Sequence, residues 1–548
     1  MPEAVIVILL LLGAAVCLEI VAERFDIPRP VVLLSGGMII ALVPGLPRLE
    51  LDPETIFILF VPPLLYWAAL TSSLRDFRTN AVVISMAGMV LVLVTIAAVA
   101  VTVRTLIPSV PWAAAVALGA IIAPPDAVVA ISMLRGLKLP RPVTTFLVGE
   151  SLVNDATALV VYRTAVAAAV AGQYSWLAGT FDFVRILIGG AGIGLAVGWL
   201  VAAIRRRAGS TSPLQNTISL LTPFAAYVPA TALHVSGVFA VVVAGIYIGR
   251  RGPHFMSPET RIQARDTWDV VTYILESLTF LLIGLDLPYA QEALHDFSGW
   301  DLIRYTAAVS GVIVLVRILA GFPAAIVPRW LAAFRGQKAA VPPWRHVLFV
   351  GWAGLRGGDS LIVALTLPVS IAVGSPFPSR NLIIVMTFGV VLISILIQGL
   401  SLRPLARLLG LRSDGLAEAE ERIARHRVAL AGLAALDGID AASVPQVDGL
   451  VVSEILQQLR DMHASEPVSS SLETRSLAPP VNRAWIRAYH EMRSRMVRAE
   501  RTEAVRLRDE DVVSDEVMYR LLRAIDFEEV LLEAKLTAIA DGARKPQQ

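Results

Sequence analysis

Long apolar runs recur through residues 1–410, and each is about as long as a bilayer is thick. A helix of roughly 20 apolar residues spans the hydrocarbon core. Only 17% of the residues are charged and the mean hydropathy is +0.67, whereas about 25% of a soluble domain is charged. No run alternates with period two, which argues against a transmembrane β-barrel. The sequence therefore predicts an all-α polytopic membrane protein.

We expect thirteen spans, and the charges of the connecting loops predict their orientation. Alternate loops, beginning with the one that holds Arg24 and Arg29, carry two to four Lys or Arg residues, while the loops between them carry one at most. Basic residues favour the cytoplasmic side. The pattern predicts a multi-pass protein of the bacterial inner membrane with its N-terminus outside. The expected spans are 4–22, 30–45, 55–72, 81–103, 111–133, 143–172, 182–204, 214–233, 236–250, 268–288, 302–328, 346–374 and 381–408.

The composition changes sharply after the transmembrane domain, which we place at residues 1–410. Residues 411–548 are polar and charge-rich, and 417–436 and 484–508 carry apolar residues at helical spacing. We expect a helical cytoplasmic domain with a Ser/Pro-rich linker at 465–480. A regulatory role and a plain packing or oligomerisation role both remain open for it. The net charge of +2 does not indicate a nucleic-acid partner.

The fifth expected span contains two prolines and an acid, Pro124, Pro125 and Asp126. Two prolines remove two backbone donors, which breaks a helix in the middle of the membrane. Freed carbonyls and helix ends can then line a cavity, as they do at the ion sites of transporters. The alternative is a kinked structural helix that Asp126 caps.

The sixth expected span carries Glu150, Ser151, Asn154 and Asp155. Ser151 and Asp155 lie four residues apart and therefore share one helix face. A carboxylate and a hydroxyl one turn apart offer hard oxygen ligands, which suit Na+. An ionisable residue inside a span is a functional hypothesis by default, because burying charge in lipid is costly. The alternative is a polar seam between helices.

The twelfth expected span surrounds Arg356 with glycines and adds an acid, Asp359. This pattern indicates an unwound segment rather than a continuous helix. Arg356 needs a negative partner, and Glu150 or Asp359 can supply it; a structural ion pair and a place on the ion path remain equally open for Arg356. Structural pairing is also the favoured interpretation for three other polar residues inside spans, which are Arg163, Glu276 and Arg317.

Several motifs in sequence order resemble the monovalent cation/proton antiporter family, in the branch of bacterial and animal Na+/H+ exchangers. The resemblance covers roughly residues 1–410. It implies two inverted repeats of six spans, with broken spans 5 and 12 crossing, and a homodimer. The motifs are Pro-Pro-Asp at 124–126, Gly-Glu-Ser at 149–151, Asn-Asp at 154–155 and Gly-Trp-Ala-Gly-Leu-Arg-Gly at 351–357, with echoes at 62–65, 234–238 and 280–285.

The resemblance also implies roles for the site residues. Asp155 resembles the essential ion-binding carboxylate, Ser151 a ligand one turn away, and Asp126 the acid of the broken helix. These three are the expected Na+ ligands, with main-chain carbonyls near Pro124 and Pro125. In the other two positions, Asn154 stands where electrogenic relatives have a second Asp, and Glu150 with Arg356 resembles a structural salt bridge.

The chain departs from the family pattern at four positions. Many relatives have Thr before the acid of the broken helix and Pro after it, where Pro125 and Ala127 stand here. Many also have an acid on the third span where this chain has Trp67. Asp359 is an additional acid beside Arg356.

These residues predict a secondary transporter in which Na+ and H+ compete for Asp155. Either ion neutralises the buried carboxylate, which lowers the cost of moving the site past an apolar barrier. One titrating acid beside a neutral Asn predicts electroneutral 1:1 exchange. No cofactor is expected beyond the transported Na+ and H+, and the other expected partner is membrane lipid.

Other functions fit the sequence less well. A K+/H+ antiporter of the same family stays open, because the sequence does not select the ion. A proton-coupled symporter for an organic solute would require a roomier site. Gly358-Asp359-Ser360-Leu361 spells a hydrolase signature but lies in a transmembrane segment, so an enzyme is not predicted. The seven histidines have no metal-binding spacing, and residues 411–548 carry no kinase or DNA-binding motif that would indicate a receptor or sensor.

Overall fold

The structure is a computed structural model, and every regular element of the residues it describes is a helix. The one β interaction among these residues is an isolated bridge between Ser370 and Pro376. The described residues are 2–43, 53–72, 75, 84–134, 137, 139–171, 176–207, 211–285, 298–334, 342–371, 376–412, 415–437, 449–465 and 483–544. The expected linker at 465–480 lies almost wholly outside them.

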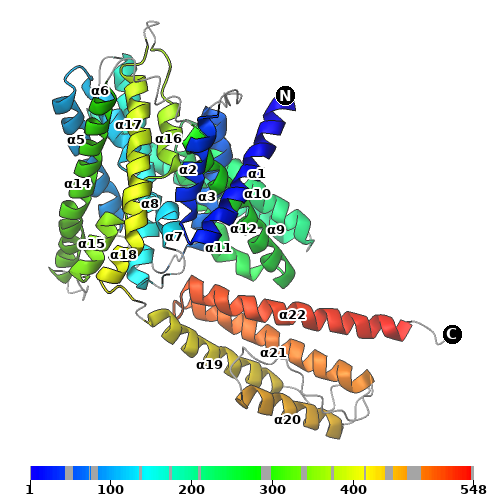
Figure 1. The fold of residues 1–548 in the computed structure, drawn as a ribbon. Helices are drawn as coiled ribbons and strands as arrows, with labels where there is room; N and C mark the ends of the chain where they lie inside the picture. The colour runs from blue at the N-terminus through cyan, green and yellow to red at the C-terminus, as the bar shows by residue number, and fades with distance from the viewer. Residues whose placement is uncertain are drawn as a thin grey trace.

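The helices up to residue 408 pack side by side in one bundle, and each expected apolar segment coincides with a helix or an interrupted pair (Figure 1). The bundle consists of α1 (Pro2–Phe25), α2 (Arg29–Ala41), α3 (Pro53–Thr71), η1 (Ala87–Leu91), α5 (Val92–Leu106), α6 (Trp112–Ile122), α7 (Ala127–Met133), α8 (Arg141–Ala171), α9 (Trp176–Arg207), α10 (Ser212–Ala232), α11 (Gly237–Arg251), η2 (Gly252–His254), α12 (Pro258–Leu285), α14 (Gly299–Phe334), α15 (Trp344–Trp352), α16 (Gly358–Leu365), α17 (Arg380–Ile393), η4 (Ser394–Gly399) and α18 (Leu400–Leu408).

By length and composition, five helices among the described residues can cross a membrane, and the bent pair α6–α7 can form a sixth span. Two further apolar helices, Arg29–Ala41 and Phe57–Thr71, are shorter than the others. The five are Ile84–Leu106, Val184–Arg207, Pro258–Leu285, Gly299–Val327 and Arg380–Leu408. Thirteen spans therefore remain a prediction.

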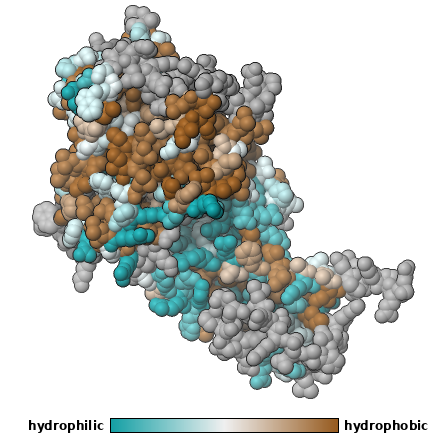
Figure 2. Space-filling view, in the orientation of Figure 1, coloured by the Kyte–Doolittle hydropathy of each residue, from teal (hydrophilic) through white to brown (hydrophobic). Residues whose placement is uncertain are grey.

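Much of the bundle face seen in Figure 2 is apolar. A hydrophobic band covers its upper body, and hydrophilic side chains gather where the bundle meets the C-terminal helices. Large apolar side chains within the bundle are strongly exposed, among them Ile188, Trp199 and Leu319. Such extensive exposed apolar surface fits contact with lipid.

In the described residues after the bundle, the helices are α19 (Leu416–Asp437), α20 (Gly449–Ser465), α21 (Arg483–Asp509) and α22 (Asp515–Arg544). They have two hydrophobic clusters of their own, one around Val428, Val497 and Leu521 and one around Leu436, Ile455 and Met492. In Figure 1 these helices lie across one end of the bundle.

Polar contacts hold the C-terminal helices against that end. The Arg261 guanidinium at the start of α12 donates two hydrogen bonds to the buried Asp526 carboxylate of α22, one of them 2.8 Å long. The Tyr519 hydroxyl donates to the Gly249 carbonyl at 3.2 Å. Glu420 pairs with Arg141, the first residue of α8, at 2.9 Å. The C-terminal helices therefore contact the helix that carries Asp155.

Candidate functional site

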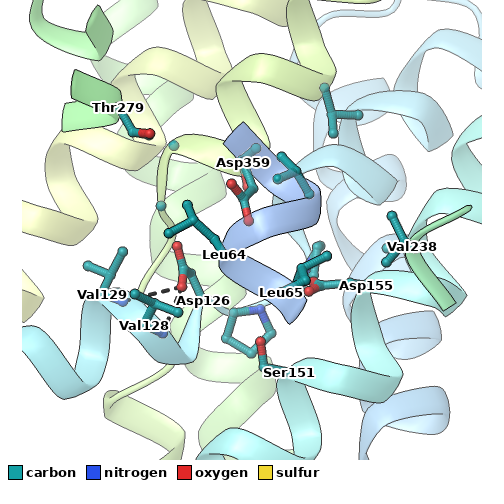
Figure 3. Close-up of a pocket in the computed structure, with 18 of the residues that line it drawn as sticks. Leu64, Leu65, Asp126, Val128, Val129, Ser151, Asp155, Val238, Thr279 and Asp359 are labelled. Carbon is teal, nitrogen blue, oxygen red and sulfur yellow. Dashed lines mark hydrogen bonds between the residues drawn. The ribbon is translucent and has the colours of Figure 1, made fainter. Parts of the chain in front are cut away.

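A cavity of about 90 Å³ opens in the bundle where two helices are interrupted. Its walls come from α3, α8, α12, the break between α6 and α7, and the break between α15 and α16. Most of the lining is apolar. The carboxylates among the lining residues are those of Asp126, Asp155, Glu276 and Asp359, and Figure 3 shows three of them around the same space.

The first break follows from Pro124 and Pro125, which end α6, and from Asp126, which begins α7. The Asp126 Oδ1 atom accepts hydrogen bonds from the backbone amides of Val128 at 2.8 Å and Val129 at 3.2 Å. These amides are the orphan donors of a helix N-terminus, where a negative charge is also favoured. The capping role that sequence analysis left as an alternative is therefore present. The second carboxylate oxygen, Oδ2, takes no part in the cap.

The second break lies over residues 353–357, between α15 and α16, and it meets the first one. The backbone amide of Asp126 donates to the Leu355 carbonyl at 2.7 Å. A π-helical turn, η4, supports the break: Ser394 Oγ accepts from the Arg356 amide at 2.9 Å, and Gln398 Nε2 donates to the Trp352 carbonyl at 3.1 Å. The expected interruptions of spans 5 and 12 are thus both present, and they are joined backbone to backbone.

Among the described residues Arg356 contacts no carboxylate; it caps the end of α6. Its guanidinium donates to the carbonyls of Ile122 and Ala123, at 2.8 Å each, and to that of Gly354. The last carbonyls of a helix lack partners and carry partial negative charge. A guanidinium with five donors suits them well.

The expected Glu150–Arg356 salt bridge does not form, because Glu150 pairs with a different arginine. Arg317 of α14 holds the Glu150 carboxylate with two hydrogen bonds, of 2.9 and 3.0 Å. The exposed fraction is 0% for Glu150 and 1% for Arg317. A bidentate guanidinium–carboxylate pair is the geometry that best offsets burial of both charges. Glu150 is absent from the cavity lining, and the pair joins α8 to α14.

Ser151 and Asp155 of α8 face the cavity from one side, as their four-residue spacing predicts (Figure 3). Neither side chain forms a hydrogen bond or ion pair with another described residue. Asn154, which is fully buried, instead donates from Nδ2 to the Pro125 carbonyl at 3.3 Å. This hydrogen bond connects α8 to the first break, and the sequence did not predict it. Pro124 and Pro125 both line the cavity.

Asp359, in the first turn of α16, faces the same cavity (Figure 3). The glycines before it allow the close packing of the breaks: a Cβ on Gly357 would overlap Asp126 Oδ2, and a Cβ on Gly358 would overlap Thr279. The run of glycines in the sequence was the signal for this packing.

The two remaining candidates differ in position. Glu276 of α12 lines the cavity and is half-buried. Arg163 is half-buried on α8, does not line the cavity, and forms no side-chain hydrogen bond or ion pair with another described residue. The pairing expected for Arg163 is therefore not seen in the described part of the chain.

No three acidic, histidine or cysteine side chains among the described residues are grouped closely enough to hold one metal ion.

Two crossed broken helices with half-buried carboxylates at their crossing define the class of this protein as an ion-coupled secondary transporter. The chain belongs to the sodium/hydrogen exchanger family, because residues 6–408 match the family described as "Sodium/hydrogen exchanger, transmembrane". This confirms the resemblance that the motifs predicted.

Similar proteins agree with that membership. A Na+/H+ exchanger of Mycobacterium tuberculosis strain H37Rv is 33% identical over 538 residues, which is 96% of each chain. The Na+/H+ antiporter NhaP of Pseudomonas aeruginosa is 35% identical over 65% of this chain and 81% of its own length. A sodium, potassium, lithium and rubidium/H+ antiporter of Bacillus subtilis is 30% identical over 72% of this chain and 60% of its own. These relatives are named as transporters, as predicted here, and not as enzymes.

The fold also resembles a solved structure. The sodium proton antiporter MjNhaP1 from Methanocaldococcus jannaschii, at pH 8, superposes with a TM-score of 0.53 over 74% of this chain and 99% of its own, at 18% identity. The all-helical antiporter fold is thereby confirmed, while the span count and the inverted repeats remain predictions.

Proposed function

We propose that this protein exchanges Na+ or Li+ for H+ across the bacterial inner membrane. The observation that carries the proposal is the position of Asp155: its carboxylate faces a cavity between two crossed broken helices and has no partner among the described residues. A charged carboxylate in a poorly solvated site is costly unless something neutralises it. A bound proton or a bound cation does so, and the family to which the chain belongs exchanges these two ions.

The mechanism is competition for Asp155. When protons are abundant, Asp155 binds H+; when they are scarce, it is free to bind Na+, with Ser151 Oγ as a neighbouring oxygen ligand. Either ion leaves the site neutral and able to pass an apolar barrier. The empty, charged site moves poorly, which couples the two fluxes. Asp126 acts as the third expected ligand through Oδ2, because Oδ1 caps α7.

The proposed stoichiometry is one Na+ for one H+. Asn154 is neutral and its amide is engaged with the Pro125 carbonyl. Glu150 is compensated by Arg317. Neither residue therefore adds a second proton to the exchange at Asp155, and the exchange is electroneutral.

The small cavity favours a bare metal ion over an organic solute. Its volume of about 90 Å³ is well below the roughly 300 Å³ or more of pockets that hold small organic molecules. K+/H+ exchange remains a second candidate, because the similar Bacillus subtilis antiporter is named for four alkali cations.

We also propose how the protein is arranged in the membrane. Residues 1–410 form thirteen spans in two inverted repeats, with the N-terminus outside and residues 411–548 as a cytoplasmic domain. Rocking of one bundle of helices around the site gives alternating access. We propose a homodimer that uses no cofactor, contacts lipid and binds no nucleic acid.

Everted membrane vesicles test the function. Respiration acidifies such vesicles, and added Na+ or Li+ should release the protons, which a pH-sensitive dye reports. Choline chloride is the control for ionic strength, and K+ is compared in parallel. Release by K+ alone would favour the second candidate, and no release by any cation would contradict exchange. Dissipating the membrane voltage should leave the rate unchanged if the exchange is 1:1.

A further inference from the structure

We propose that Asp359 is a second cation-binding carboxylate, so that the transported ion lies between Asp155 on α8 and Asp359 on α16. The proposal rests on the proposed function and names a further residue of the same site. It gives a role to the acid that departs from the family pattern.

Asp155 and Asp359 face the same cavity (Figure 3). Asp155 lies on the continuous helix α8, and Asp359 lies in the first turn of α16, which follows the second break. A cation held between two carboxylates gains attraction from both, and low-dielectric surroundings strengthen that attraction.

The Asp359 carboxylate is available to an ion. The Asp359 side chain forms no hydrogen bond or ion pair with another described residue, and the N-terminus of α16 has no side-chain cap. The other two acids of the cavity are less available: Asp126 keeps only Oδ2 free, because Oδ1 caps α7, and Glu276 makes interactions of its own. Asp155 and Asp359 are therefore the two cavity carboxylates with oxygens fully free for an ion.

The wall formed by α3 offers no side-chain oxygen to an ion. The part of α3 that lines the cavity is apolar, namely Phe57, Val61, Leu64 and Leu65. Trp67 of the same helix stacks on Trp268, with ring centroids 5.7 Å apart, and does not line the cavity. Na+ prefers oxygen ligands, and α3 offers no side-chain oxygen to this space. Asp359 supplies oxygens from the other side.

Asp155 and Asp359 would hold the ion between them, with Ser151 beside Asp155. Binding would then link α8 to the second broken helix, so that the ion itself bridges two elements of the site.

The test measures the Na+ dependence of exchange by the full-length protein in proteoliposomes. Asp359→Asn removes the charge and should raise the Na+ concentration for half-maximal exchange about tenfold or more, while exchange at saturating Na+ persists. The half-maximal Na+ concentration of Asp359→Glu should lie between those of the wild type and Asp359→Asn. The control is Asp301→Asn, which removes an acid at the start of α14, away from the cavity.

A second readout separates ion binding from stability. Na+ should raise the thermal unfolding temperature of the purified wild type, because a ligand that binds only the folded state stabilises it. The same Na+ concentration should raise the unfolding temperature of Asp359→Asn by a smaller amount. A helix-terminal acid with a purely structural role would lower the unfolding temperature with and without Na+ by the same amount.

An unchanged half-maximal Na+ concentration in Asp359→Asn, with an active wild type, would overturn the role of Asp359 and leave the proposed function standing. Absence of Na+-driven proton movement in the wild type would instead overturn the proposed function. If Asp359→Asn does not fold, the same Na+ titration is made with Asp359→Ser, which keeps an oxygen without charge. An unchanged half-maximal Na+ concentration in that variant would then overturn the role of Asp359.

Discussion

The backbone amide of Asp126 donates a hydrogen bond to the backbone carbonyl of Leu355, 2.7 Å away. The two residues belong to different broken helices, so this bond fixes the crossing of the two interruptions. It also places the Asp126 carboxylate against Gly357, with one oxygen capping α7 and the other toward the second break. A main-chain hydrogen bond between the two interruptions therefore supports the geometry of the proposed ion site.

Gly357→Ala tests whether this close approach matters. A Cβ on Gly357 would overlap Asp126 Oδ2, so the carboxylate or the second break must shift. We expect Na+/H+ exchange to fall at least tenfold, which corresponds to about 1.4 kcal/mol. Gly311→Ala is the matched control, because a Cβ there has nothing within 4 Å. Equal exchange rates of both variants in vesicles would contradict the packing argument.

The Glu150–Arg317 pair should contribute to stability rather than to ion selectivity. Arg317→Met leaves Glu150 as a buried unpaired charge, which costs about 3–5 kcal/mol. The double variant Glu150→Gln with Arg317→Met removes both charges and should recover part of that loss. Thermal unfolding of the purified proteins measures the difference. A double variant no more stable than Arg317→Met would show that the ion pair itself is not the cause.

Asn154→Asp should change the electrical character of exchange. The substitution removes the amide that donates to the Pro125 carbonyl and adds a second acid beside Asp155. We expect exchange to become dependent on membrane voltage, and stability to fall by about 1 kcal/mol through the lost hydrogen bond. Asn154→Ala loses the same hydrogen bond without adding charge, so its exchange should stay independent of voltage. Voltage dependence in neither variant would contradict the proposed role of the neutral Asn.

The contact between Arg261 and Asp526 should make docking of the C-terminal helices sensitive to pH once Arg261 is removed. Burial raises the pKa of Asp526, and Arg261 opposes that rise. In Arg261→Met the buried carboxyl can take up a proton, whereas Asp526→Asn leaves a buried guanidinium that cannot lose one. Docking in Arg261→Met should therefore be intact at acid pH and weaken, by about 1–3 kcal/mol, as the pH rises through the raised pKa of Asp526.

Limited proteolysis of the C-terminal helices across a pH series measures this docking. Arg261→Met should be cleaved faster as the pH rises, and Asp526→Asn should be cleaved faster than wild type at every pH. Equal cleavage of all three proteins would show that the pair does not hold these helices in place.

Local sequence patterns predicted the main features of the site. Pro124 with Pro125, and the glycines around Arg356, predicted both helix breaks, because each pattern removes helix stability at its own position. The spacing of Ser151 and Asp155 predicted that both face one space. These features depend on residues within one or two helix turns, so the sequence carries them directly.

Partners that lie far apart in sequence were not predictable in the same way. Glu150 and Arg317 are 167 residues apart, and no spacing rule connects them. Arg356 was expected to need an acid, yet the carbonyls at the end of α6 satisfy it. Either of two buried arginines, Arg317 or Arg356, could have paired with the buried Glu150. Only the packing of α8 against its neighbours selects Arg317.

The most direct measurement is Na+-driven proton movement in everted vesicles that contain Asp155→Asn. An amide of the same shape can neither take up a proton nor carry a compensating negative charge. If Na+ and H+ compete for Asp155, exchange by this variant disappears at every Na+ concentration while the protein remains folded and inserted. Exchange at or near the wild-type rate would contradict competition of Na+ and H+ at Asp155.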